Sequence, residues 1–239
     1  MRKHTLISWS SGKDSAWALH VLRQDPEIEV LGLFTVVNAK HQRVAMHAVR
    51  LRLLELQAEA VGLPLRVIEI PDPCSDEQYQ SAMRQFIDES LSQGVQCVAF
   101  GDLFLQDVRD YRERQLGGTG IVPCFPLWNQ PTRELANKML AAGLRAIVTC
   151  VDPRKLPGHY VGRVWSKTLL DELPATVDPC AENGEFHTVV VDGPMFLRPV
   201  PVQIGETVER EGFVFADVLP IEAVDAVGVH NQESPFLVL

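Results

Sequence analysis

The stretch Ser10-Ser11-Gly12-Lys13-Asp14-Ser15 lies between an apolar run at residues 5–9 and an amphipathic run at residues 16–22. This order predicts a strand, a short turn and then a helix. The first N–H groups of a helix lack partners within it, and the helix dipole makes that end partly positive. The turn therefore suits a phosphate group, because three serines add hydroxyl donors, Gly12 lets the backbone approach closely, and Lys13 supplies a cation.

The same six residues are also compatible with an ordinary surface turn before a helix. In that case Ser11 or Asp14 would act as the N-cap of the helix. The segment is not a P-loop of the Walker type, because the spacing G-x-x-x-x-G-K-[ST] is absent. Both alternatives stay open on this segment alone.

Strand-like and helix-like segments alternate through the first two thirds of the chain. The predicted strands are residues 5–9, 29–37, 65–70, 96–100 and 145–151, and the predicted helices are residues 12–23, 46–61, 75–92 and 133–142. Repeated units of this kind imply a doubly wound α/β fold with a mainly parallel sheet. Ligands then bind beyond the carboxyl ends of the strands, where we expect residues 10–15, Asn38, Gly101-Asp102 and Asp152.

The pattern changes after Asp152, where Pro and Gly become frequent and short β-prone runs replace the helical periodicity. We expect a smaller, mixed or mostly β C-terminal lobe beside the sheet. The predicted division is a nucleotide-binding domain at residues 1–155, a substrate-side lobe at 156–222 and a weakly structured tail at 223–239.

Composition limits the classes of function. The 239 residues have a formal net charge of −9, which argues against general electrostatic binding to nucleic acid or to an anionic membrane. No apolar run approaches the roughly 20 residues that span a bilayer. The five cysteines form no C-x-x-C pair and suit a reducing compartment, so a cytoplasmic location is expected.

A second dense polar cluster follows Asp178. Within residues 182–188, the side chains of Glu182, Glu185 and His187 are candidates for proton transfer, and carboxylate oxygens there suit Mg²⁺. The alternative is a polar β-turn that enters a hairpin strand, since Asn183-Gly184 is a turn signal.

Gly101-Asp102 follows a predicted strand and precedes a charged helical segment. Asp102 is a candidate ligand for a metal or a ribose hydroxyl. Arg109 and Arg112 share a helix face and are candidates to clamp a phosphate or a carboxylate, although ion pairing on a solvated helix explains them equally well. Asp152 and Arg163 form a weaker candidate pair.

Together these motifs resemble the PP-loop ATP pyrophosphatases, and among them the diphthine–ammonia ligase (diphthamide synthetase) family and its bacterial relatives. The loop at residues 10–15 is similar to the family's S-G-G-K-D-S, with Ser11 in place of the first glycine. Residues 182–188 followed by 192–196 match G-E-x-G-E-F-x-T…D-x-P-x-F, with Ala181 where the family usually has glycine. Gly101-Asp102 and Pro126-Leu127-Trp128 match its middle motifs, so the resemblance spans roughly residues 5 to 220.

The resemblance implies a fold of the HUP type and cleavage of ATP between its α- and β-phosphates. A carboxylate would form an acyl-adenylate, and ammonia would then displace AMP to leave an amide. In that family the acceptor is the diphthine side chain of translation elongation factor 2, whereas a bacterial chain would need a different carboxylate. A homodimer is compatible with the sequence.

The resemblance also assigns roles to residues. The catalytic candidates are Lys13, Asp14, Glu182, Glu185 and His187. The ATP-binding candidates are Ser10, Ser11, Gly12, Lys13, Asp14, Ser15, Gly101 and Asp102, with Asp14 and Asp102 holding Mg²⁺. The substrate-binding candidates are Arg109, Arg112, Asn183, Gly184 and Thr188.

Two other functions remain open at this point. One is another PP-loop adenylating enzyme, such as a tRNA-thiolating enzyme, although those typically use cysteine pairs and a basic surface. The other is a nucleotide-binding sensor on the same fold that performs no chemistry.

Overall fold

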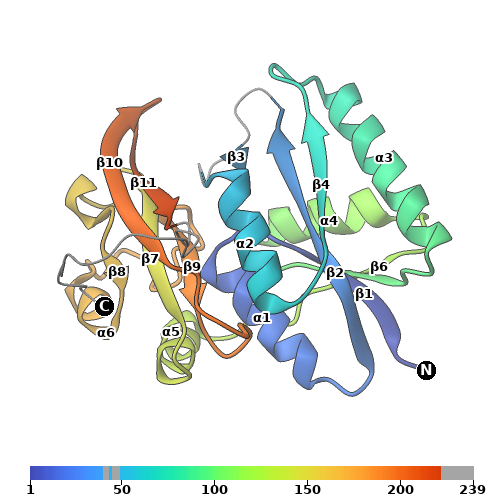
Figure 1. Cartoon of the computed structure of the whole chain (residues 1–239), viewed down its shortest axis with the longest axis horizontal. Coiled ribbons are helices and arrows are strands. Elements are labelled where there is room, and N and C mark those ends of the chain that lie inside the picture. Colours follow the sequence, from blue (N-terminus) through green and yellow to red (C-terminus); the bar gives the residue numbers. More distant parts are fainter. Residues whose placement is uncertain (40–42, 45–48, 222–239) are drawn as a thin grey trace, which may run out of the picture.

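A computed structural model describes residues 1–39, 43–44 and 49–221 and arranges them around two sheets (Figure 1). Five strands of the first sheet are parallel, in the order β4-β2-β1-β5-β6. Their bounds are β1 Lys3–Ser8, β2 Ile28–Asn38, β4 Leu65–Ile70, β5 Cys97–Ala99 and β6 Val122–Cys124, and the short β3, Arg43–Val44, pairs antiparallel with the end of β2. The predicted α/β fold with a parallel sheet is confirmed.

Helices cover both faces of this sheet (Figure 1). Their bounds are α1 Lys13–Gln24, α2 Leu51–Val61, α3 Asp76–Ser92 and α4 Gln106–Leu116. Successive side chains of β1 point to opposite faces, so Ile7 packs with the apolar residues of α1 and α2 while Leu6 packs with Phe86 of α3. The first strand is therefore buried on both sides, as its continuously apolar sequence indicates.

Local sequence accounts for the ends of these helices. Ser75 caps α3 and forms a reciprocal capping box with Gln78. Gly62 ends α2 with a φ of +69°, which a glycine adopts without strain. The helix predicted from residue 46 is observed from Leu51, and residues 45–48 lie outside the described part of the chain.

The second sheet is antiparallel and is built from the C-terminal part of the chain. Its strands are β7 Arg145–Val151, β8 Val164–Trp165, β9 Phe186–Asp192, β10 Val202–Arg210 and β11 Phe213–Pro220, and it is accompanied by α5 Thr132–Ala141, the 3₁₀ turn Gly158–Tyr160 and α6 Lys167–Glu172. The β-rich C-terminal lobe is confirmed.

The placement of residues 145–151 in the parallel sheet was wrong. This strand, β7, pairs antiparallel with β8, β9 and β11 instead. It is buried from Ala146 to Val151 and follows a helix, so its local sequence looks like one more unit of the parallel sheet. Pairing with strands far along the chain decided its place, and local periodicity does not report such pairing.

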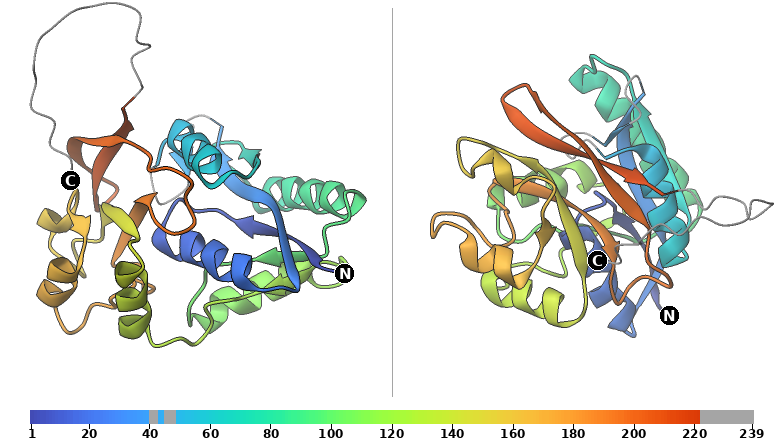
Figure 2. Two further views of the ribbon diagram at one scale, coloured as in Figure 1. Left: turned by 60° about the horizontal axis from the view of Figure 1, so that its bottom comes forward. Right: turned by 60° about the vertical axis from the view of Figure 1, so that its left-hand side comes forward.

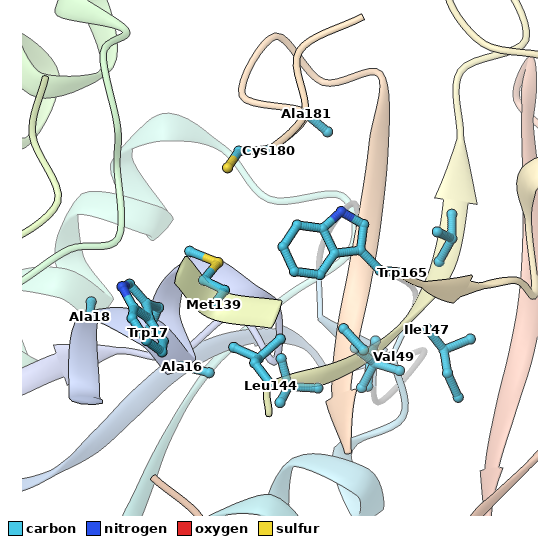
Figure 3. Close-up of a cluster of buried hydrophobic side chains, with 14 of the residues drawn as sticks. Ala16, Trp17, Ala18, Val49, Met139, Leu144, Ile147, Trp165, Cys180 and Ala181 are labelled. Atoms are coloured by element: carbon cyan, nitrogen blue, oxygen red, sulfur yellow. The ribbon is translucent and has the colours of Figure 1, made fainter. Parts of the chain in front are cut away.

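One large apolar cluster joins the two sheets. It includes Ile7 of β1 and Ala16 of α1 together with Val148 of β7 and Val190 of β9. Figure 3 shows Ala16 and Trp17 beside Met139, with Trp165 on the far side of Met139, and Figure 2 shows the two sheets from further directions. The division at residue 155 stays a prediction, and the predicted tail at 223–239 lies outside the described residues.

Within the described residues, no helix combines the length and the apolar character needed to cross a bilayer.

Candidate functional site

A cavity of about 450 Å³ lies where the carboxyl ends of β1 and β5 face the loop that precedes β9. Most of the candidate site residues line it: Ser10, Gly12, Lys13, Asp14, Ser15, Gly101, Asp102, Arg112, Glu182, Asn183, Gly184, His187 and Thr188. Five candidates do not, namely Ser11, Arg109 and Glu185 together with the weaker pair Asp152 and Arg163. Segments far apart in the sequence therefore share one cavity, and a hydrogen bond between Lys13 and Cys180 joins them across 167 positions.

The 10–15 loop forms a small network of hydroxyl groups. Ser11 has a φ of +71°, and Gly12 is the N-cap residue of α1 without any side-chain cap. The Gly12 N–H donates to Ser10 Oγ at 3.3 Å, Ser10 Oγ lies 3.1 Å from Ser15 Oγ, and Ser15 Oγ donates to the Gly12 carbonyl at 3.0 Å. Neither Ser11 nor Asp14 therefore acts as the N-cap residue of α1, which was the alternative interpretation of this segment.

Lys13 joins the loop to the C-terminal part of the chain. Its backbone N–H donates to Thr188 Oγ1 at 3.2 Å, and its ammonium donates to Asp14 Oδ2 at 2.8 Å and to the Cys180 carbonyl. Burial by itself would lower the pKa of Lys13, but the charge and hydrogen bond of Asp14, with further contributions from Cys180 and Glu182, outweigh it and raise that pKa. Lys13 is therefore a buried cation in the cavity wall at neutral pH.

Asp14 Oδ1 and Asp102 Oδ2 are buried carboxylate oxygens, and neither has a hydrogen-bond partner among the described residues. Burial raises the pKa of both carboxyl groups, with partial compensation from Lys13 at Asp14 and from Arg112 at Asp102. No three metal-binding side chains gather within the described part of the chain. Two carboxylates suit Mg²⁺, which commonly takes one or two of them and completes its shell with phosphate and water.

Gly101 allows β5 to end directly against α1. A Cβ at this position would lie 2.8 Å from the carbonyl carbon of Asp14 and 2.8 Å from the backbone nitrogen of Ser15. The absence of a side chain at Gly101 therefore admits the backbone of the helix, and this contact brings Asp102 next to the 10–15 loop.

Glu182 faces the cavity from the loop before β9. Its Oε1 accepts from the Leu103 N–H at 2.7 Å and more weakly from the Phe104 N–H at 3.4 Å. Burial raises the pKa of Glu182 to about 7, assisted by the charges of Asp14 and Asp102 and opposed by these two hydrogen bonds. A carboxyl group with this pKa exchanges a proton readily near neutral pH.

Glu185 lies behind the cavity wall and is only 2% exposed. Its Oε1 accepts from the Asp178 N–H at 2.9 Å and from Asn183 Nδ2 at 3.2 Å, and Asp178 Oδ2 in turn accepts from the Glu182 N–H at 2.9 Å. These contacts hold the turn that carries Glu182 and Asn183. A catalytic role for Glu185 stays a prediction, and its contacts are those of a residue that shapes the loop.

His187 lines the cavity on β9. Burial and the positive charge of Lys13 lower the pKa of His187 to about 4. The imidazole is therefore neutral at pH 7, so it can accept or donate a hydrogen bond but does not add a positive charge to the site.

The two candidate arginines of α4, Arg109 and Arg112, lie in different places. Arg112 lines the cavity, and its Nε is 3.7 Å from Asp102 Oδ2. Arg109 instead pairs with Glu113 at 2.7 Å, and its guanidinium lies 4.8 Å from the ring centres of both Phe125 and Trp128. The structure thus brings Arg112 to the cavity and leaves Arg109 outside its wall.

The weaker candidate pair, Asp152 with Arg163, is not formed. Asp152 pairs with Arg154 at 2.7 Å, and Arg163 pairs with Glu172 at 2.6 Å. Asp152 does not line the cavity either, because β7 belongs to the second sheet.

Several residues near the site escaped the sequence analysis. Phe100, Leu105 and Val108 supply apolar cavity wall, and Gln57 of α2 bonds the backbone of the 10–15 loop. Gln57 follows Leu53 by one helical turn, so a polar residue on the apolar face of this helix was the available signal. The apolar wall carried no signal, because such residues look like ordinary core.

Comparison with known proteins identifies the family of this chain. The family model of the diphthamide synthase N-terminal domain matches residues 2–121, and that of the diphthamide synthase C-terminal domain matches residues 131–224. A Homo sapiens protein named diphthine--ammonia ligase is 24% identical over 246 residues, covering 91% of this chain and 89% of its own length. Proteins of the same name from Rattus norvegicus and Danio rerio are 24% identical over 208 residues and 28% identical over 182 residues, covering 81% and 69% of this chain and 75% and 71% of their own lengths. With both domain models matched in order along most of its length, the chain belongs to the diphthamide synthase family.

Proposed function

We propose that this chain is an ATP-dependent ligase that converts a carboxylate to an amide, with AMP and pyrophosphate as the other products. In the first step a carboxylate oxygen of the acceptor attacks the α-phosphorus of ATP and pyrophosphate leaves. In the second step ammonia attacks the acyl carbon and AMP leaves, so one amide forms for each ATP consumed. Both carbon and phosphorus centres keep their oxidation states, and no redox partner is needed.

One observation carries the proposal. The 10–15 loop, the Asp102 carboxylate and the 182–188 segment line the same cavity, where Asp14 Oδ1 lacks a hydrogen-bond partner among the described residues and Asp102 Oδ2 has only the ion pair with Arg112 Nε at 3.7 Å. Buried polar atoms are normally paired, because burial of an unpaired carboxylate oxygen is costly. A bound cation with its phosphate ligands would complete their bonding.

One hydroxyl group beside the loop is suited to a phosphate. Thr188 Oγ1 and Ser10 Oγ already accept backbone N–H groups, from Lys13 and Gly12 respectively. A hydroxyl that accepts one hydrogen bond still has its own hydrogen to donate. The hydrogen of Thr188 Oγ1 is therefore available to a ligand, whereas Ser15 Oγ gives its hydrogen to the Gly12 carbonyl and Ser10 Oγ gives its own to Ser15 Oγ. The ligand would meet the Thr188 hydroxyl and the positive start of α1.

Asp14 and Asp102 are the residues that would hold Mg²⁺. When bound, this ion would neutralise charge that develops on the leaving pyrophosphate. Lys13 would stabilise the same charge from beside Asp14, as a buried cation that is already paired and fixed.

Glu182 is the proposed proton acceptor for the second step. Attack by ammonia creates a positively charged nitrogen that must lose a proton before the amide is stable. With its pKa raised to about 7 by burial, the Glu182 carboxylate can take up this proton at neutral pH. Asn183, Gly184 and the neutral His187 would orient the acceptor, and Arg112 would attract its carboxylate.

The names of the relatives, diphthine--ammonia ligase, point to ammonia as the nitrogen donor and to a diphthine-bearing acceptor. At 24–28% identity we extend to this chain the ammonia and the carboxylate class of acceptor. A cytoplasmic place of action is part of the proposal, as ATP and ammonium are both available there.

The test measures pyrophosphate and AMP release with Mg²⁺, ATP and ammonium, with and without a panel of carboxylates, and identifies the product by mass. The expected result is stoichiometric AMP, pyrophosphate and amide that appear only with an acceptor. Tight ATP binding without turnover across cell extract and the whole panel would favour a nucleotide sensor and overturn the proposal.

A further inference from the structure

Gln57 is a buried amide in the middle of α2. Its side chain is fully buried, between apolar neighbours on the same helix such as Leu53, Leu54 and Ala58. Burial of an amide is unfavourable unless its donors and acceptor are bonded. A polar side chain at such a position therefore needs partners, and Gln57 has three.

All three partners lie outside α2. Gln57 Oε1 accepts from Trp9 Nε1 at 2.9 Å, and Gln57 Nε2 donates to the Ser11 carbonyl at 3.1 Å and to the Val190 carbonyl at 2.6 Å. Trp9 and Ser11 flank the start of the 10–15 loop, and Val190 belongs to β9. One side chain thus ties the loop to both the helix behind it and the second sheet.

The Ser11 carbonyl is held from two sides. Besides Gln57, it accepts the backbone N–H of Val190 at 2.9 Å. The Ser11–Gly12 peptide is trans, so its carbonyl and the Gly12 N–H point in opposite directions. Fixing the carbonyl toward Gln57 therefore turns the Gly12 N–H the other way, toward Ser10 Oγ and the cavity wall.

This fixation opposes a backbone preference. Ser11 has a φ of +71°, a conformation that disfavours residues with a Cβ. Its own hydroxyl is buried and has no hydrogen-bond partner among the described residues, so the side chain of Ser11 does not stabilise the turn. Two hydrogen bonds to the Ser11 carbonyl therefore stabilise the positive-φ conformation that the Ser11 side chain does not stabilise.

We infer that Gln57 is a positioning residue for the nucleotide phosphates, which acts by setting the orientation of the Ser11–Gly12 peptide. The inference rests on the proposed function, because it assumes that the 10–15 loop receives the phosphates. Gln57 does not line the cavity, so it would act on the phosphates only by orienting this peptide.

The test compares full-length Gln57→Met and Gln57→Glu with Leu54→Val, a substitution of another buried residue on the same helix. Met keeps the length of the side chain but removes the donors, while Glu keeps an acceptor for Trp9 and loses the donors to both carbonyls. Calorimetric titration with α,β-methylene ATP and Mg²⁺ gives the affinity, thermal unfolding gives stability, and hydrogen exchange of residues 9–15 without nucleotide reports the loop.

We expect the affinity of both Gln57 variants to fall about tenfold or more, equivalent to ~1.4 kcal/mol, with faster exchange across the loop. Leu54→Val should lower the unfolding temperature and leave affinity and loop exchange as in the wild type. Affinity and exchange that stay unchanged in folded Gln57 variants would overturn the inference. Failure of the wild type to bind the analogue would overturn the proposed function, and the exchange comparison would then still decide whether Gln57 holds the loop.

Discussion

The ammonium of Lys13 donates to the backbone carbonyl of Cys180, 167 positions further along the chain. The same ammonium pairs with Asp14, and its own backbone N–H reaches Thr188. One residue of the N-terminal loop thereby fixes both ends of the C-terminal segment that faces it.

Lys13→Met should abolish ATP turnover and destabilise the fold by about 3 kcal/mol, because removal of one partner of a buried pair leaves the other charge uncompensated. Urea unfolding and a pyrophosphate assay measure the two effects. Lys138→Met, which alters an exposed lysine of α5, is the matched control and should change neither. Normal turnover in folded Lys13→Met would contradict the role of this cation.

Asp102→Asn should raise the Mg²⁺ concentration needed for half-maximal turnover about tenfold, or ~1.4 kcal/mol, because an amide oxygen is a weaker ligand than a carboxylate. The measurement is a Mg²⁺ titration of the rate at saturating ATP. Asp107→Asn on α4 is the control, since Asp107 is exposed and does not line the cavity. An unchanged Mg²⁺ requirement in the Asp102 variant would remove this residue from the metal site.

Activity should rise with pH through about 7, because the pKa of Glu182 is raised to about 7 by burial and only its ionised form accepts a proton. In Glu182→Gln the rise of kcat with pH through about 7 should disappear, and kcat itself should fall to a small fraction of the wild-type value. The profile would speak against Glu182 if both enzymes kept the same rise.

The same pKa predicts the direction of a stability difference. Below the ordinary pKa of 4.5 both folded and unfolded wild-type chains are protonated at Glu182, whereas above about 7 the folded chain contains a buried charge that the unfolded chain exposes to water. Glu182→Gln should therefore gain stability relative to the wild type as pH rises from 4.5 to 8, and no gain is expected below 4.5. Urea unfolding at pH 4, 6 and 8 measures this trend.

Ser11→Gly should stabilise the chain by about 1 kcal/mol, since glycine relieves the left-handed backbone and the unpaired hydroxyl is removed. Ala181 has a φ of +58°, so Ala181→Gly should also be tolerated because glycine adopts this left-handed conformation without strain. Ala18→Gly in the middle of α1 is the matched control and should destabilise by about 1 kcal/mol. Thermal unfolding checks all three, and equal losses at positions 11 and 18 would show that strain at Ser11 is absent.

Much of the site followed from sequence because its residues cluster locally. The residues of the 10–15 loop and of the 182–188 segment stand next to one another in the chain, and the order of strand, turn and helix placed the first group at a sheet edge. The two departures from the family's motifs, Ser11 and Ala181, also turned out to be informative, because both adopt a positive φ that glycine favours.

Other features depended on contacts that local sequence does not encode. The pairing of β7 with β9 and β11 decides which sheet it joins, and its apolar residues fit either sheet. Arg109 and Arg112 share one helix face in sequence, yet Glu113 and two aromatic rings hold the first while the second borders Asp102. Gln57 acts through hydrogen bonds to Trp9, Ser11 and Val190, residues brought to it only by the completed fold.

The apolar cluster that includes Trp17 of α1 and Met139 of α5 has a consequence for any hybrid between relatives (Figure 3). A chimera that takes residues 2–121 from one parent and 131–224 from another would bring side chains of two parents into contact within this close-packed cluster. Such a chimera should unfold as cooperatively as its parents only when all residues of this cluster come from the same parent.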